Sequence, residues 1–179
     1  MSNSSTRGQL LTIEGVRGRD LTSAARRLSR SQRTQDGAFS IWDASGIFYE
    51  IQGLDSRHKP SQATLILLYA ADLHFRLRWQ ILPALEEGKT VVAAPYVETA
   101  IAAGLASGLP RKWVTELFRF APKPSASFWL EGSPVISGSP ESGFLEFCGK
   151  TLHKDFFDKF SAHFAALRRR GKYELLDLK

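Results

Sequence analysis

One stretch decides the fold: Gln9-Leu-Leu-Thr-Ile-Glu14, followed by Gly15-Val-Arg-Gly-Arg-Asp-Leu-Thr22. The first six residues form a short apolar run, which predicts a buried strand that ends before Gly15. Asp20 is suited to cap a helix that continues through Leu28. A buried strand, a glycine-containing turn and a helix in this order predict the start of an α/β domain.

The rest of the chain repeats this alternation. Further apolar runs predict strands at 38–42, 90–94, 125–131 and 173–178. Helical patterns lie at 60–86 with a break at Pro83, 96–105, 110–120 and 152–170, while 47–53 fits a short strand or a short helix. Strands that alternate with helices predict a three-layer α/β/α fold with a five-stranded parallel sheet. Ligands of such sheets bind at the carboxyl ends of the strands, where we expect the functional residues.

Length and composition predict one ordinary globular domain. The chain has 179 residues, of which 43% are hydrophobic and 23% charged. We expect a disordered polar leader at 1–8 and a single domain at 9–179. No apolar run approaches the ~20 residues of a membrane-spanning helix. A lone cysteine, Cys148, fits a buried position in a reducing compartment, so we expect a cytoplasmic protein.

The positive charge lies at the two ends of the chain. The net charge is +6, with seven arginines in residues 1–33 and eight basic residues in 150–179. These basic ends leave open an interaction with an acidic partner. No aromatic residues are interleaved with the basic runs, which argues against a surface for nucleic acid.

The turn after the first strand partly matches a phosphate-binding loop, G-x-x-x-x-G-K-[ST]. Gly15 and the final hydroxyl of Thr22 are present, but the second glycine is Asp20 and the lysine is Leu21. Taken alone, the stretch fits either a degenerate phosphate loop or an ordinary turn between a strand and a helix.

Other motifs add weight to the phosphate loop. They are Glu14-Gly15-Val16, Leu67-Leu68-Tyr69-Ala70-Ala71-Asp72, Ile81-Leu82-Pro83-Ala84-Leu85-Glu86-Glu87-Gly88-Lys89-Thr90-Val91-Val92, Tyr96-Val97-Glu98 and Trp113-Val114-Thr115-Glu116-Leu117. In order and spacing they resemble the thymidylate kinase family, from about Leu10 to Glu131. The resemblance implies a P-loop kinase fold and a homodimer, for which the apolar helix from Leu65 to Trp79 offers an interface. It also implies transfer of the γ-phosphate of ATP to thymidine monophosphate with Mg²⁺.

The resemblance assigns candidate site residues. On the phosphate side these are Gly15, Gly18, Thr22 and Ser23, with the Thr22 hydroxyl near Mg²⁺; on the nucleoside side they are Tyr69, Asp72, Tyr96 and Glu98. Tyr69 matches the aromatic residue that stacks on thymine, although a core aromatic residue fits its helical position equally well. For Thr22 the alternative is a hydroxyl at the start of a helix. Trp42 and Asp43 fit either the wall of the pocket or surface packing.

The family's phosphate-binding cations are missing. The loop lysine is Leu21, the arginine after the third strand is Pro95 and the pocket arginine is Leu73. Between Arg119 and Arg168, where the family carries lid arginines, there is none. Because each such group is typically worth ~10²–10³ in rate, we expect no efficient phosphoryl transfer.

Three functions remain open. The first is a thymidylate-kinase-like pseudoenzyme that binds a nucleotide or another phosphate-bearing small molecule. The second is a divergent kinase that uses ATP and Mg²⁺, with Arg17 or Arg19 as the catalytic cation in place of the lysine. The third is an interaction protein that binds an acidic partner through the basic ends of the chain.

Overall fold

The computed structural model of this chain describes residues 8–15, 18–31, 37–51, 60–130, 144 and 154–175. The predicted leader, apart from Gly8, lies outside the described residues, and so do the loop 132–143 and Cys148. Gly8 donates its backbone N–H to the Leu85 carbonyl (3.1 Å).

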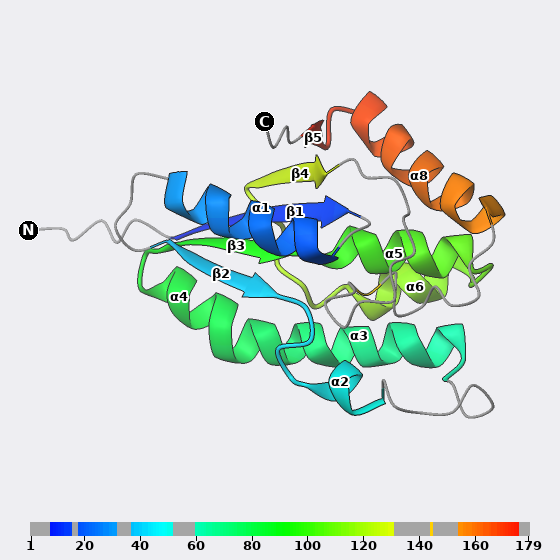
Figure 1. Ribbon diagram of the computed structural model, residues 1–179, viewed down its shortest axis with the longest axis horizontal. Coiled ribbons are helices and arrows are strands. Elements are labelled where there is room, and N and C mark those ends of the chain that lie inside the picture. Colours follow the sequence, from blue (N-terminus) through cyan, green and yellow to red (C-terminus); the bar gives the residue numbers. More distant parts are fainter. Residues whose placement is uncertain are drawn as a thin grey trace, which may run out of the picture.

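The strands form one parallel sheet, as the sequence predicts (Figure 1). They are β1 (Gln9–Gly15), β2 (Ala38–Ile41), β3 (Thr90–Ala94), β4 (Ala126–Leu130) and β5 (Glu174–Leu175). Their order in the sheet is β2-β3-β1-β4-β5, and all four pairings are parallel. The carboxyl ends of all strands therefore meet at one edge.

The helices follow the predicted pattern with one difference, which lies at Pro83. They are α1 (Gly18–Ser31), α2 (Ile47–Ile51), α3 (Gln62–Arg76), η2 (Leu77–Ile81), α4 (Leu82–Glu86), α5 (Val97–Ala106), α6 (Arg111–Leu117) and α8 (Lys154–Arg169). The segment that fitted either a strand or a helix is the helix α2. The expected break at Pro83 is wrong, because a π-helical turn, η2, precedes the proline and the helix continues into α4. Pro83 lies in the first turn of α4, where a missing N–H costs little.

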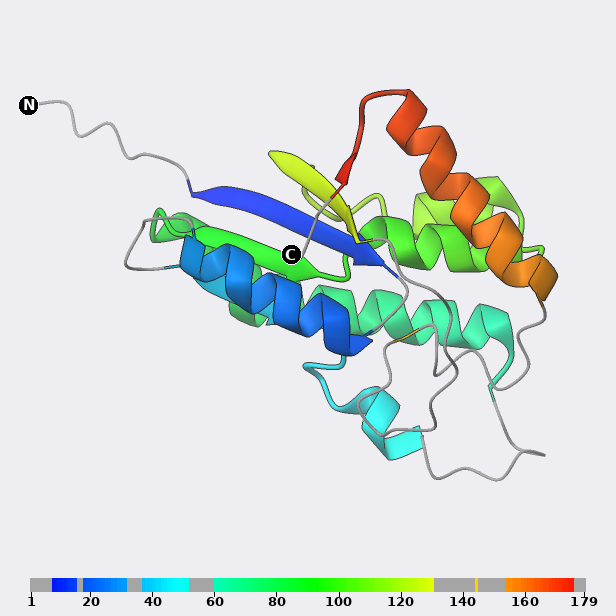
Figure 2. The ribbon, with the colours of Figure 1, turned by 45° about the horizontal axis from the view of Figure 1, so that its top comes forward.

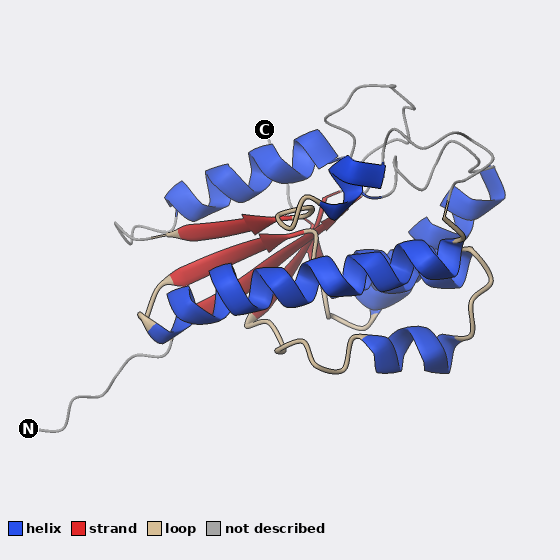
Figure 3. Cartoon of the chain, turned by 90° about the horizontal axis from the view of Figure 1, so that it is seen from below, coloured by secondary structure: helices blue, strands red, loops and turns tan. Residues whose placement is uncertain are grey.

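Two hydrophobic clusters cover the two faces of the sheet. Alternate residues of β1 and β3 point to opposite faces, so that Leu11, Ile13 and Val92 pack against α1 while Leu10 and Val91 belong to the larger cluster on the other face. Figure 3 shows the strands between these two helical layers. On the second face, α8 packs against α5 (Figure 2). The three-layer α/β/α architecture is confirmed.

A buried carboxylate joins the central strand to α5. Glu14, at the end of β1, is fully buried. Its oxygens accept hydrogen bonds from the backbone N–H groups of Tyr96 (3.0 Å), Glu98 (3.1 Å) and Thr99 (3.1 Å), and from the Thr99 hydroxyl (2.6 Å). The first N–H groups of a helix have no partner within the helix and carry its positive dipole, so a carboxylate is suited to this position. Burial nevertheless raises the pKa of Glu14 to about 7, against the opposing effect of the Thr99 and Tyr96 hydrogen bonds.

The elevated pKa makes a pH-dependent contribution to stability that can be measured. The folded chain holds this proton up to about pH 7, whereas an unperturbed carboxyl loses it near pH 4.5. The free energy of unfolding is therefore expected to fall by up to about 3 kcal/mol as the pH rises from 4.5 through 7, and to level off above that. Urea unfolding at several pH values measures this slope, and Glu14→Gln is expected to remove this part of it. Parallel slopes for the two proteins would contradict the assignment.

Candidate functional site

The carboxyl edge of the sheet is where this topology places a ligand. From β1 the chain continues toward β2, at one edge of the sheet, whereas from β4 it continues toward β5, at the opposite edge. A crevice forms outside strands whose connections diverge in this way. The turns after β1, β2 and β3 carry most of the predicted site residues to this edge.

The helix after β1 begins within the stretch that matches a phosphate-binding loop. In a phosphate-binding loop, the backbone N–H groups between the first glycine and the lysine converge on the phosphates. Here α1 already begins at Gly18, so Gly18, Arg19 and Asp20 are helical and only two residues separate β1 from the helix. Arg17 and the side chain of Arg19 lie outside the described residues. The turn thus retains the N-terminus of α1, whose dipole favours an anion, with the acidic Asp20 in its first turn.

Leu21 occupies the expected lysine position as a core residue. Its side chain is only 2% exposed and belongs to the cluster between α1 and the sheet. A Cβ atom added to Gly15 would lie 3.1 Å from Leu21 Cδ2 and 3.0 Å from the Leu130 carbonyl oxygen. Leu21 therefore packs directly beneath the turn. Thr22 and Ser23 both lie near the start of α1. Thr22 is partly buried, and Ser23 is exposed.

Asp72 holds the turn after β2. Its buried carboxylate accepts hydrogen bonds from the Asp43 N–H (3.0 Å), the Ser45 N–H (2.9 Å) and the Ser45 hydroxyl (2.8 Å). Asp43 in turn accepts from the N–H groups of Phe48 (2.8 Å) and Tyr49 (2.9 Å) at the start of α2. Asp43 has a positive φ of 57°, a conformation that aspartate tolerates better than most residues. Both carboxylates thus stabilise loop and helix ends.

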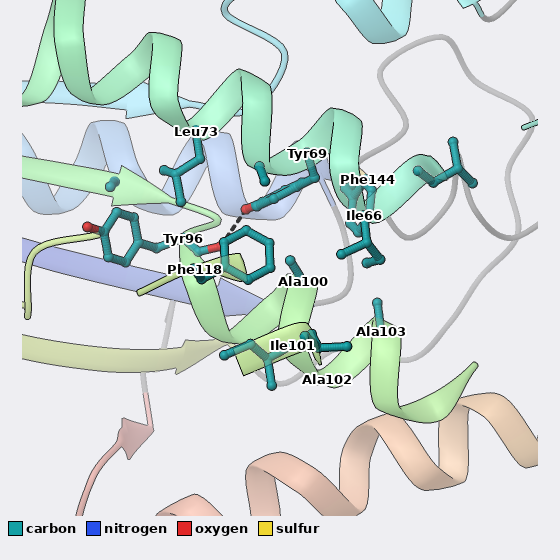
Figure 4. Close-up of a cluster of buried hydrophobic side chains, with 14 of the residues drawn as sticks. Ile66, Tyr69, Leu73, Tyr96, Ala100, Ile101, Ala102, Ala103, Phe118 and Phe144 are labelled. Atoms are coloured by element: carbon teal, nitrogen blue, oxygen red, sulfur yellow. Dashed lines mark hydrogen bonds between the residues drawn. The ribbon is translucent and has the colours of Figure 1, made fainter. Parts of the chain in front are cut away.

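The predicted nucleoside-side tyrosines meet, but inside the core. Tyr69 is 0% exposed, and its hydroxyl donates to the backbone carbonyl of Tyr96 (2.5 Å; dashed line in Figure 4). Its ring packs against Phe144 and Phe118. Tyr96 is also buried, and its hydroxyl donates to the Pro122 carbonyl (3.0 Å). In this structure Tyr69 has the position of the core alternative, with no ring face exposed to solvent.

Glu98 points away from this cluster, toward α8. One of its carboxylate oxygens lies 2.9 Å from His163 Nε2, and both side chains are largely buried. Of the predicted nucleoside-side residues, Tyr69, Asp72 and Tyr96 therefore gather around the ends of β2 and β3, while Glu98 connects two helices.

The sequence reasoning missed one buried cation at this edge. Arg76 is 0% exposed; its Nε donates to Ser40 Oγ (3.0 Å), and its Nη2 donates to the carbonyls of Ser40 (3.0 Å) and Pro95 (2.9 Å). Its Nη1 is buried and has no hydrogen-bond partner among the described residues. The signal was present, because Arg76 falls on the apolar stripe of the helix that carries Tyr69 and Asp72. It links the end of β2 to the turn after β3.

The described residues provide no preformed metal site. Nowhere in this part of the chain do three or more His, Cys, Asp or Glu side chains group closely enough to hold an ion. Magnesium at the start of α1 would depend on the Thr22 hydroxyl and on phosphate oxygens supplied by a ligand. Nor does any helix within these residues have the length and apolarity needed to cross a membrane.

Comparisons with known proteins agree on one relationship. No model of a known protein family matches the chain. The chain is 27% identical over 179 residues to "Probable thymidylate kinase" of Staphylothermus marinus, which covers 97% of this chain and 88% of that protein. It is 29% identical over 133 residues to "Probable thymidylate kinase 2" of Saccharolobus solfataricus, covering 73% of this chain but only 62% of that protein.

A solved structure extends the relationship to the fold. The crystal structure of thymidylate kinase from Ehrlichia chaffeensis superposes with a TM-score of 0.69 at 12% identity, and covers 94% of this chain and 92% of that one. This similarity supports the P-loop kinase fold, which the strand order and the three layers also indicate. The sequence comparisons confirm the resemblance of this chain to thymidylate kinases, and the structural comparison confirms the P-loop kinase fold.

Proposed function

We propose that this chain is a thymidylate-kinase-like pseudoenzyme that binds a nucleotide or another phosphate-bearing small molecule without transferring a phosphoryl group efficiently. The observation that carries the proposal is Leu21, a buried core residue where the family has its phosphate-binding lysine. Phosphoryl transfer depends almost entirely on positioning and on charge stabilisation. A leucine supplies neither to a phosphate.

Two features support residual binding at the phosphate side. The N-terminus of α1 lies at the carboxyl edge of the sheet and favours an anion. Thr22 and Ser23 place hydroxyl groups in its first turns, and Arg17 and Arg19 add positive charge to the same turn in the sequence. ATP with Mg²⁺ is the natural first ligand to test, because relatives of this chain are named thymidylate kinases.

A homodimer belongs to the same proposal. The outward face of α3 and η2 exposes large apolar side chains, namely Leu67 (48%), Phe75 (39%) and Trp79 (65%). They lie on the helix that the sequence analysis singled out as an interface. A cytoplasmic location likewise remains a prediction from the sequence.

Turnover and binding test the proposal separately. A coupled assay with ATP, thymidine monophosphate and Mg²⁺ is expected to stay at background, and the double variant Arg17→Ala, Arg19→Ala is expected not to change it. In a thermal-shift assay ATP or ADP is expected to raise the melting temperature of the wild type. Turnover above background that disappears in the double variant would instead establish the divergent kinase.

Restoring the lysine is expected to harm the protein rather than repair it. Leu21→Lys places an ammonium group in the apolar layer between α1 and the sheet, so we expect it to lower the free energy of unfolding by about 3 kcal/mol or more. Leu21→Met, which nearly conserves volume, serves as the control and is expected to cost less than about 1.5 kcal/mol. Urea unfolding measures both. A stable lysine variant with tighter ATP binding, with or without Asp20→Gly, would show that position 21 faces the ligand.

A further inference from the structure

An aromatic cluster near the carboxyl edge has an unusual member. Trp42 follows β2, Phe48 lies on α2 and Tyr69 lies on α3. Phe144 comes from the segment between β4 and α8, yet it is only 1% exposed and packs against all three. Figure 4 shows its position next to Tyr69.

The ring of Phe144 is surrounded by the other rings. Its centroid lies 4.6 Å from that of Tyr69 with the planes tilted by 54°, 5.7 Å from that of Phe48 at 78°, and 6.2 Å from that of Trp42 at 64°. These distances are typical of favourable aromatic pairs. Trp42, Phe48 and Tyr69 thus form a slot of about one ring in size, and Phe144 fills it.

The walls of this slot do not depend on Phe144 alone. Trp42 and Phe48 are in contact with each other, at 4.9 Å between centroids. Tyr69 is fixed by the hydrogen bond of its hydroxyl to the Tyr96 carbonyl and by Phe118, whose ring lies 6.1 Å away. Removal of the Phe144 ring is therefore expected to leave a cavity rather than a collapsed core.

We propose that Phe144 is an internal occupant of this slot and excludes the planar base of a nucleoside from it. An apolar cavity left by a deleted core side chain can stay open and bind a ring of matching size. A pyrimidine base is a planar ring of about that size whose faces stack on aromatic side chains, and the slot includes Tyr69, the residue that matches the family's base-stacking position. The inference rests on the proposed function in one respect, the class of ligand.

A gain of binding tests the proposal. The probe is thymidine, which carries the base without a phosphate, in a thermal-shift assay on the full chain. Wild type is expected not to respond. Phe144→Ala is expected to melt at a lower temperature without ligand and to recover about 3–5 °C at a thymidine concentration of ten times Kd.

Phe160→Ala is the matched control. Phe160 is equally buried and sits among aromatic rings on α8 and β4, against Trp129 (6.1 Å) and Phe164 (5.2 Å). Its removal creates a similar cavity away from Tyr69, so no thymidine response is expected. Phe144→Leu keeps an apolar side chain but removes the planar ring from the slot. If the alanine variant does not fold, the response of the leucine variant to thymidine decides the question.

The outcomes separate this proposal from the proposed function. Thymidine shifts that are equal in wild type and Phe144→Ala, equal in Phe144→Ala and Phe160→Ala, or absent from both Phe144 variants would each overturn the role of Phe144. The proposed function is judged instead by ATP and ADP binding to wild type, which involves the turn after β1. Either proposal can therefore fail while the other holds.

Discussion

The fold at the carboxyl edge depends on one interaction, the burial of the Glu14 carboxylate against the N-terminus of α5. A carboxylate away from water is costly unless donors surround it. Three backbone N–H groups and the Thr99 hydroxyl provide them. Because Glu14 ends the central strand, this contact sets where α5 begins and hence where the chain turns after β3. The positions of Tyr96 and Glu98 follow from it.

The same principle extends along this edge. Asp72 accepts hydrogen bonds from backbone N–H groups in the turn after β2, and Asp43 caps α2. Arg76 connects β2 with the turn after β3. In an active nucleotide site, groups of this kind would be directed at phosphates, sugar or metal. Here they are engaged in hydrogen bonds within the protein. Among the buried side-chain nitrogen and oxygen atoms of the described residues, only Arg76 Nη1 has no hydrogen-bond partner. These internal hydrogen bonds support the proposal of a weak binder rather than an efficient catalyst.

The sequence predicted the fold well because strand and helix periods are local signals. The strand 90–94 and the helix near 154–169 follow directly from runs and spacing of apolar residues. The predicted helix break at Pro83 was wrong, because a π-helical turn before the proline accommodates it where a regular α-helix would not. Whether such a turn forms depends on packing and is not a local signal in the sequence. The roles of Glu14 and Phe144 could not be read from the sequence, because their partners are distant along the chain: Thr99 lies 85 residues from Glu14, and Phe48 lies 144 − 48 = 96 residues from Phe144. For Tyr69, the sequence left base stacking and core packing equally open, and only the neighbouring rings distinguish them.

The burial of Leu21 limits which side chains this position accepts. The neighbours of Leu21 suit an apolar side chain, and Gly15 and Leu130 lie close to it. A lysine introduced at position 21 alone would meet surroundings that suit only an apolar side chain. It would be accommodated only after several neighbouring positions had changed as well.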